Sequence, residues 1–200
     1  MSVMNGFREE LVKSLSGING DFIIYESTDK EISKLQQAYP DAKIVKNYQQ
    51  RVITTNDRGI EGLLMKSMTI EDFYKIPRLN ENLFEIEKIE ENWVFIGTEL
   101  ARSLDVKVGD SLQISIPGSS MTILGPVLNS HILLIKGIFN TGIYDYDKYF
   151  IYSNESYFKE ISDYPVFEVY EGNTKIDLKN LGTMIYDTWS DQNQSLAQAL

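Results

Sequence analysis

The segment that decides the fold lies between residues 111 and 144 and reads SLQISIPGSSMTILGPVLNSHILLIKGIFNTGIY. It holds one formal charge, Lys136, although 24% of the residues in the chain are charged. Two apolar arms flank Leu124-Gly125-Pro126, and the run Pro117-Gly118-Ser119-Ser120 interrupts the first arm. Glycine and proline are the residues that most often mark turns between strands. The segment therefore predicts a β-hairpin whose tip spans residues 123–128.

Two interpretations of this tip are open. An exposed apolar tip is an aggregation hazard unless something covers it. Either residues 123–128 fold back onto their own domain as part of its core, or they bind a partner. The pattern alone does not separate these two interpretations.

Alternating strand and helix patterns lie on both sides of this segment. Before it, the sequence predicts strands at residues 21–26, 42–55, 60–68 and 93–97. It also predicts a helix that starts within residues 27–31, with Thr28 or Asp29 as its cap, and ends at residues 39–41, and a short helix at 98–104 with Thr98 as its N-cap. From the second arm of the segment onward, strands at 132–139, 147–152 and 166–170 alternate with helices at 154–161 and 177–189.

Two similar α/β units thus surround a different middle region, which indicates an insertion rather than three domains in series. We expect an α+β fold in which residues 1–70 and 142–200 form a mixed α/β subdomain. Residues 71–141 are expected to form a β-rich subdomain that includes the hairpin at 121–131. Apolar residues at helical spacing also predict a helix at each end of the chain, over residues 1–16 and 196–200.

Composition and charge exclude several classes of function. The 200 residues contain no cysteine and one histidine, so thiol chemistry, a cysteine zinc site and a multi-histidine metal site are not expected. The net charge of −10 disfavours nucleic acid and anionic membrane surfaces as partners, because both need a basic face. No run approaches the ~18–20 apolar residues of a membrane span, and the first residues lack the pattern of a signal peptide. The chain by itself is expected to be soluble.

No motif in the sequence indicates an enzymatic reaction. A phosphate-binding glycine loop with its lysine is absent, and no nucleophile elbow accompanies His131, which lies in an apolar arm. The acidic pairs Glu90-Glu91 and Asp145/Asp147 are better explained as solvated acids than as glycosidase or calcium-binding groups. We therefore expect no enzyme activity, no metal and no cofactor.

Four motifs follow one another along the chain. They are Met1-Ser2-Val3-Met4-Asn5-Gly6-Phe7; Ile96-Gly97-Thr98-Glu99-Leu100-Ala101 with Leu104, Val106 and Gly109-Asp110; Lys136-Gly137-Ile138-Phe139 with Tyr144, Asp145 and Asp147; and Trp189 with Asn193, Leu196, Ala199 and Leu200. Together they resemble the periplasmic domain of lipoprotein-releasing ABC permeases of the LolC/LolE family. The resemblance covers the whole chain. It implies that the N-terminal residues correspond to the exit of the first membrane helix and that the C-terminal residues lead into the second.

The resemblance implies a MacB-like periplasmic fold, with a mixed α/β porter part made from both chain ends and an inserted β-rich sabre part. It places the chain on the periplasmic face of the bacterial inner membrane, between the first two membrane spans of a permease. The implied partners are a sister permease subunit, a separate cytoplasmic ATPase subunit, the lipoprotein substrate and a LolA-like periplasmic chaperone. No nucleic acid is implied.

In this family a hairpin called the hook recruits the chaperone. The resemblance places the hook on Thr122, Ile123, Leu124, Gly125, Pro126, Val127, Leu128, Asn129, Ser130 and His131. The apolar members would contact the chaperone, and the last three residues would form a polar rim. LolC-type subunits tend to have a polar–basic pair after the hook, whereas this chain has Ser130-His131 without a fixed positive charge. A LolE-like subunit, or one permease that combines both roles, is therefore also open.

Two other functions stay open. One is a MacB-type efflux or mechanotransmission domain, which would engage a trans-periplasmic adaptor. The other, from a different class, is an extracellular sensor or hydrolase domain. An apolar span of about 20 residues on each side of this sequence would support transport. A signal peptide followed by a stop codon would support the sensor or hydrolase.

Overall fold

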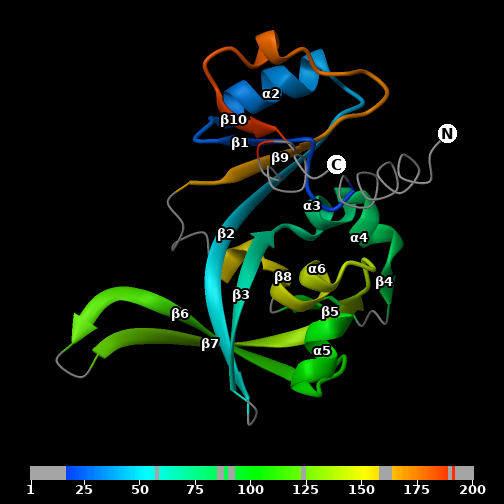
Figure 1. Ribbon diagram of the computed structural model, residues 1–200. Helices are drawn as coiled ribbons and strands as arrows, with labels where there is room; N and C mark the ends of the chain where they lie inside the picture. The colour runs from blue at the N-terminus through cyan, green and yellow to red at the C-terminus, as the bar shows by residue number, and fades with distance from the viewer. Residues whose placement is uncertain are drawn as a thin grey trace, which may run out of the picture. The chain divides into compact units, whose positions relative to one another are not determined.

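The computed structural model describes residues 17–56, 59–84, 88–89, 93–122, 125–157, 164–188 and 191. Its elements, in chain order, are β1 (Phe22–Tyr25), α2 (Asp29–Ala38), β2 (Lys43–Asn56), β3 (Gly59–Met68), α3 (Ile70–Lys75), α4 (Pro77–Glu81), β4 (Leu83–Phe84), β5 (Trp93–Gly97), α5 (Thr98–Leu104), β6 (Ser111–Thr122), β7 (Gly125–Phe139), α6 (Tyr144–Tyr149), β8 (Phe150–Asn154), η1 (Glu155–Tyr157), β9 (Val166–Tyr170), η2 (Leu178–Leu181) and β10 (Ile185–Thr188) (Figure 1). The helices expected at the two chain ends lie outside the described residues.

The chain divides into two compact units. Unit 1 consists of Met1–Asn47, Ile70–Asn80 and Tyr164–Leu200, and unit 2 consists of Tyr48–Thr69 and Glu81–Asp163. These boundaries differ from the expected ones, because residues 48–69 and 142–163 belong to unit 2 and residues 71–80 to unit 1. The physical reason is strand pairing: β3 pairs with β8 and β8 with β5, so all three strands belong to one sheet.

Unit 1 contains an antiparallel sheet, on which helix α2 packs, and it also includes α3 and most of α4. The strand order is β10-β1-β9-β2, in which β2 takes part through residues 43–47. Helix α2 contributes Leu35 to a core with residues of β1, β2 and β9, and Tyr39 follows the helix into the same core. The core members are Phe22, Ile24, Leu35, Tyr39, Ala42, Ile44, Phe167, Val169, Ile176 and Leu181.

Helix α2 begins as the sequence predicts. Thr28 is the N-cap, its hydroxyl accepts from the backbone N–H of Glu31, and the Glu31 carboxylate accepts from the backbone N–H of Thr28 at 2.9 Å. This is a capping box, which satisfies two backbone donors that the first turn leaves open. The local signal therefore decided this boundary.

The helix expected at residues 177–189 does not form. Leu178–Leu181 is a single 3-10 turn, and Gly182 follows it with a φ of +59°, which a helix cannot continue. Ile185–Thr188 is strand β10, which pairs with β1. The spacing of Leu178, Leu181 and Ile185 fits a helix, but the second half of the segment pairs with the edge of β1 and forms a strand instead.

Unit 2 contains a mixed sheet. Its strands follow the order β2-β3-β8-β5-β7-β4, with β6 paired to β7 and β2. The β3–β8 and β5–β7 pairs are parallel. Helix α5 packs on the sheet through Leu100 and Ala101. The core members are Val52, Leu63, Met65, Val94, Ile96, Leu100, Ala101, Leu112, Ile114, Ile116, Leu133, Ile135 and Ile151.

Two expected boundaries in unit 2 are wrong in detail. Residues 147–149 belong to the short helix α6, so the strand expected from residue 147 begins at Phe150 as β8. The reason is a polar contact, because the buried Asp147 carboxylate binds the preceding loop and holds one helical turn there. Gly97, not Thr98, is the N-cap position of α5.

Candidate functional site

Strands β6 and β7 form the hairpin that the uncharged segment predicts. Their antiparallel ladder runs from the pair Ser111–Leu134 to the pair Thr122–Gly125. At the base of the hairpin, alternate side chains enter the core of unit 2. These are Leu112, Ile114, Ile116, Leu133 and Ile135, each at most 3% exposed. The base is therefore anchored by the same apolar cluster that holds β5 and α5.

The outer half of the hairpin consists of residues 117–122 of β6 and 125–128 of β7. Among the described strands, it pairs with no strand outside the hairpin. β6 pairs with β2 through Ile114 and Ser115 alone, and β7 pairs with β5 from Leu134 onward. Figure 1 shows the outer ends of β6 and β7 extending past the other strands of unit 2. A two-stranded ribbon is marginally stable on its own and cannot bury both of its faces. Among the described strands, this part of unit 2 therefore has no neighbour outside the hairpin itself.

An irregularity bends the outer half. Four steps from Pro117 to Met121 on β6 face only two steps from Leu128 to Pro126 on β7, so β6 carries two extra residues. A bulge of this kind increases twist and re-aims the strand beyond it. Proline lacks a backbone N–H, so one proline on each strand also hinders the addition of further strands at the edges.

The ten predicted hook residues fall into three groups that differ in their place in the structure. Ile123 and Leu124 lie outside the described residues. Thr122, Gly125, Pro126 and Leu128 are paired strand residues rather than a loop, and Val127 lies on β7 between two of them, so the expected tip at 123–128 is shorter than predicted. Asn129 and Ser130 are exposed on β7, and His131 is half-buried opposite Ile114.

One apolar residue near the hairpin base escaped the sequence prediction. Ile132 is 66% exposed, because alternation along β7 directs its neighbour Leu133 into the core and Ile132 to the opposite face. On that face the hydroxyls of Ser115 and Ser130 lie 2.8 Å apart. The signal was present in the unbroken run from Ile132 to Ile135, which is apolar at both faces of a strand.

Three residues of the quoted family motifs meet at one place in unit 2. Gly97 and Phe139 are register partners in the β5–β7 pair, and Gly137 is the partner of Phe95. A Cβ atom at Gly137 would lie 2.9 Å from the Phe95 ring, so only glycine fits there without a shift. A Cβ atom at Gly97 would lie still closer to its neighbour, which is the backbone of Asp147 in α6. These motif glycines therefore serve packing rather than chemistry.

Asp147 is the most constrained carboxylate at that place. It is 2% exposed, and its Oδ1 accepts from the backbone N–H and the hydroxyl of Thr141, both at 2.8 Å. Its Oδ2 accepts from the backbone N–H of Gly142 at 3.2 Å. Desolvation raises the pKa of Asp147, although these hydrogen bonds act in the opposite direction. The group closes the loop before α6 and faces no reactive partner.

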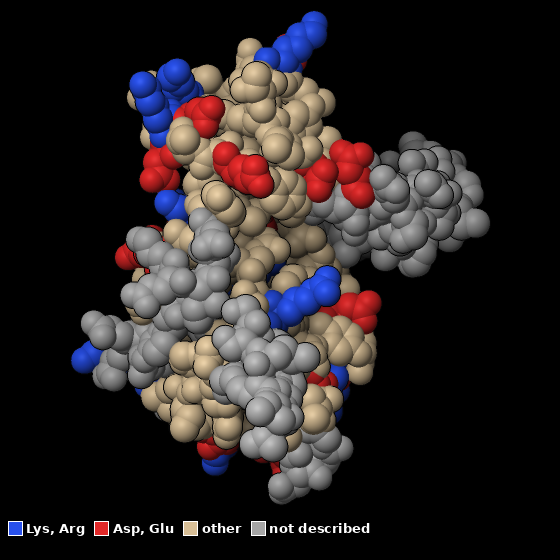
Figure 2. All heavy atoms as spheres, turned by 90° about the vertical axis from the view of Figure 1, so that its left-hand side faces the viewer, with Lys and Arg blue, Asp and Glu red and all other residues tan. Residues whose placement is uncertain are grey.

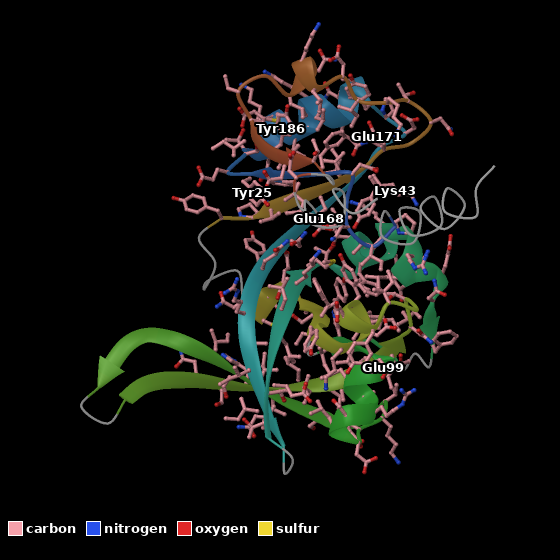
Figure 3. The ribbon with its side chains drawn as sticks, in the orientation of Figure 1. Tyr25, Lys43, Glu99, Glu168, Glu171 and Tyr186 are labelled. Carbon is pink, nitrogen blue, oxygen red and sulfur yellow. The ribbon has the colours of Figure 1, made fainter. Side chains whose placement is uncertain are left out.

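A second polar group lies in the sheet of unit 1. Glu168 on β9 is fully buried and accepts from the side-chain amide of Asn47 at 3.1 Å and from the hydroxyl of Tyr170 at 3.0 Å. Tyr25 donates to Asp187 at 3.1 Å, and burial followed by this bond raises the pKa of Tyr25 to about 12 (Figure 3). These contacts join neighbouring strands, so we interpret the group as structural.

The residues that the structure describes do not form a metal centre. No three histidine or acidic side chains in that part of the chain could hold a metal ion. In Figure 2 the Lys and Arg atoms of the described residues occur as separate small groups on the face shown. No described helix is both long and apolar enough to cross a membrane.

Comparison with known proteins identifies the architecture. No protein-family model matches the sequence, and no curated protein matches it. The structure is similar to the extracellular domain of the noncanonic ABC-type transporter YknZ from Gram-positive bacteria, with a TM-score of 0.51 and 12% identity, covering 90% of this chain and 94% of that one. A domain of a putative permease protein from Porphyromonas gingivalis matches with a TM-score of 0.43 and 10% identity, covering 88% and 70%.

At 12% identity the similarity to YknZ establishes the fold and nothing further. The predicted α+β class is confirmed: the chain has a mixed α/β, sheet-rich architecture of the kind found in the extracellular domain of an ABC-type transporter.

Proposed function

We propose that this chain is the extracytoplasmic domain of an ABC-type permease of the lipoprotein-releasing LolC/LolE type, and that the outer half of the β6–β7 hairpin binds a LolA-like periplasmic chaperone. The observation that carries the proposal is the outer half itself. It is an uncharged ribbon that pairs with no other described strand. The similarity in fold to an ABC-transporter domain supports the same proposal.

Docking of such a hairpin is a binding event and involves no reaction on this chain. An apolar ribbon that enters an apolar cavity gains roughly 25 cal/mol per Å² of surface removed from water. Between residues 111 and 135 no formal charge is present, so burial of the ribbon leaves no unpaired charge without solvent. Its two prolines restrict the backbone before binding, which lowers the entropy lost on docking.

In the proposed transporter, the energy for transport does not come from this chain. ATP hydrolysis belongs to a separate cytoplasmic ATPase subunit, and a sister permease subunit completes the assembly. This chain would handle the lipoprotein substrate and hold the chaperone on the periplasmic face of the inner membrane. No catalytic residue is proposed, and neither a metal nor a cofactor is required.

A MacB-type efflux or mechanotransmission domain is the second candidate, since it has the same expected architecture. It would engage a trans-periplasmic adaptor rather than a lipoprotein chaperone. The two candidates therefore differ in the partner that the chain binds, and a binding experiment separates them.

The first experiment measures chaperone affinity and thermal stability together. Binding of the chain to the purified LolA-like chaperone of the same organism is followed by calorimetry. Leu124→Asp and Val127→Asp are expected to weaken binding by at least ~2 kcal/mol, about thirtyfold. Their melting midpoints should stay near that of the parent, because the described core ends at Ile116 on β6 and Leu133 on β7.

Two matched variants control this experiment. Ile60→Asp makes the same kind of change at an exposed residue of unit 2 outside the hairpin, and it should leave chaperone affinity unchanged. Ile114→Asp introduces a charge at a fully buried base position and should unfold unit 2. A hairpin variant that unfolds, or that binds the chaperone normally, contradicts the hook. Binding to an adaptor alone supports the efflux candidate.

The second experiment tests the side of the membrane. These 200 residues contain no cysteine, so Asn129→Cys adds one thiol at an exposed position of β7, and the parent full-length protein controls for labelling at any other position. In spheroplasts that contain the full-length protein, a membrane-impermeant maleimide should label this thiol without lysis. Labelling that appears only after lysis contradicts an extracytoplasmic location.

A further inference from the structure

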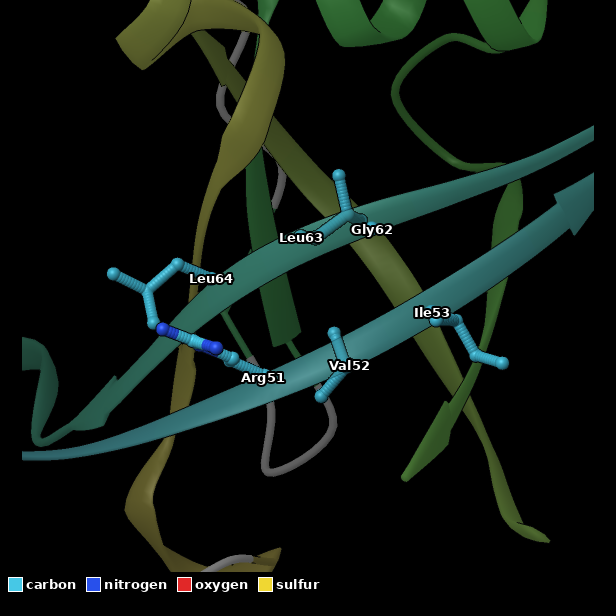
Figure 4. A pocket seen from close by; sticks show the side chains of 6 residues that line it. All are labelled: Arg51, Val52, Ile53, Gly62, Leu63 and Leu64. Atoms are coloured by element: carbon cyan, nitrogen blue, oxygen red, sulfur yellow. The ribbon is translucent and has the colours of Figure 1, made fainter. Parts of the chain in front are cut away.

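We propose that the face of the β2–β3 strand pair in unit 2 holds a binding site for an amphiphile with one acyl chain and one anionic head group. The site is a groove of about 500 Å³ on this pair (Figure 4). Its described lining consists of Arg51, Val52, Ile53, Gly62, Leu63 and Leu64. The proposal does not depend on the chaperone function assigned to the hairpin.

Strand register decides which side chains face the groove. Arg51 is opposite Leu64 and Ile53 is opposite Gly62, and residues opposite one another project from the same face of a strand pair. The intervening pair, Val52 and Leu63, turns its side chains into the core of unit 2. The groove face therefore presents two apolar side chains, one bare glycine and one cation.

Glycine at position 62 creates the opening. A Cβ atom built there would meet no atom within 4 Å, so space lies directly above the strand. The backbone of Gly62 is not in the left-handed region, so no conformational requirement explains a glycine here. Glycine inside a strand weakens the strand and often marks a place where a ligand approaches closely.

The chemistry of the lining selects the ligand. A peptide adds to a sheet at an edge, where backbone groups pair, whereas a ligand on the face meets side chains. Ile53 and Leu64 offer no hydrogen-bonding groups, so a hydrocarbon chain fits them better than a polar molecule. A volume of about 500 Å³ lies within the usual range of small-molecule sites.

Arg51 supplies the recognition of charge. It is exposed, and in the part of the chain that the structure describes no carboxylate pairs with its guanidinium. This is notable in a chain with 29 acidic and 19 basic residues. Guanidinium binds carboxylate and phosphate groups through two parallel hydrogen bonds. An anionic head group placed at Arg51 would leave the acyl chain along Ile53, Gly62 and Leu64.

The test uses octanoate, decanoate and dodecanoate as probes, each below its micelle concentration, with binding to the intact chain measured by calorimetry. Affinity should rise with chain length by up to about fourfold per added methylene until the groove is full. Gly62→Leu fills the opening and should weaken dodecanoate binding at least about tenfold without lowering the melting midpoint. Gly62→Ala should have a smaller effect in the same direction.

A second comparison isolates the head group. Arg51→Gln should weaken dodecanoate binding about tenfold and leave dodecanol binding unchanged, since only the charge-assisted hydrogen bonds are lost. Arg102→Gln, the same change at an exposed arginine of α5 outside the groove, should alter neither. The proposal is overturned if no probe binds saturably, if Gly62→Leu binds dodecanoate like the parent, or if association occurs only with anionic phospholipid vesicles.

Discussion

The backbone of Gly97 lies so close to the backbone of Asp147 that no side chain fits between them. A Cβ atom at position 97 would overlap the carbonyl group and the Cα atom of Asp147. Gly97 ends β5 and precedes α5, and Asp147 belongs to α6, so this approach allows α5 and α6 to pack against each other. A motif that resembles a family signature is thus explained by a steric requirement.

Replacement of Gly97 by alanine is expected to destabilise unit 2 strongly. The added methyl group has to push α6 away from β5, and overpacking of this kind costs about 1–3 kcal/mol. Urea unfolding at neutral pH measures the change. Gly62→Ala is the matched control, because the same methyl group meets no atom there and should leave stability unchanged or slightly higher. Equal effects at the two glycines would contradict the steric explanation.

Asp147→Asn is expected to destabilise the chain, because the amide nitrogen placed at Oδ2 cannot accept from Gly142. The loss should also depend on pH. The folded state raises the pKa of Asp147 above 3.8, so the folded chain binds more protons than the unfolded chain in this window. The stability that this group contributes is complete below pH 3.8 and is lost as pH rises through the folded pKa.

The variant has no such titration, so its deficit relative to the parent should be largest near pH 4 and smaller at pH 7. Urea unfolding of both proteins across this range gives the comparison. A deficit that grows as pH rises would mean that the folded state favours the ionised carboxylate, contrary to the expectation.

Tyr25→Phe tests the hydrogen bond to Asp187. Removal of one bond of this kind should cost about 1 kcal/mol at pH 7. Because burial and the bond to Asp187 raise the pKa of Tyr25 from its ordinary value of 10.0 to about 12, its contribution is present below pH 10 and lost as pH rises toward 12. The phenylalanine variant should therefore lose less stability than the parent between pH 10 and 12. Parallel alkaline unfolding curves for the two proteins would refute this assignment.

Thr28→Ala removes the N-cap of α2 and should lower stability by about 1 kcal/mol. The backbone N–H and the hydroxyl of Thr28 both lower the pKa of Glu31, and the variant loses the hydroxyl, so NMR titration should show that this pKa is higher in the variant. Ser33→Ala is the control within the same helix. Its hydroxyl only donates back to the Asp29 carbonyl, and alanine is the better helix former, so little or no loss is expected.

Local signals in the sequence predicted several features correctly. The capping box of Thr28 and Glu31 placed the start of α2, since both partners lie within three residues. The uncharged segment with its apolar arms predicted the β6–β7 hairpin, because the two strands are neighbours in sequence. The position of the hook residues on this hairpin came from a family resemblance, and the chaperone contact stays a prediction.

Features that depend on residues far apart in the sequence could not be predicted from local patterns. The segment at 177–189 has helical spacing, yet Ile185–Thr188 becomes a strand because β1 offers an unpaired edge more than 150 residues earlier. The division into two units was misplaced because β3 and β8, far apart in the chain, pair in parallel. The exposed Ile132 was missed because an apolar run does not say which of its residues faces the core.

The sequence by itself determined the class of fold, the place of the hairpin and the start of α2, since these depend on contacts between residues close together in the chain. Only the tertiary structure decided which side chains share a face. It set Arg51 beside Leu64 and Ile53 beside an empty position 62, and it brought Gly97 against Asp147. Strand register and close backbone approach join residues that are remote in sequence, and no local pattern encodes which remote pairs will meet.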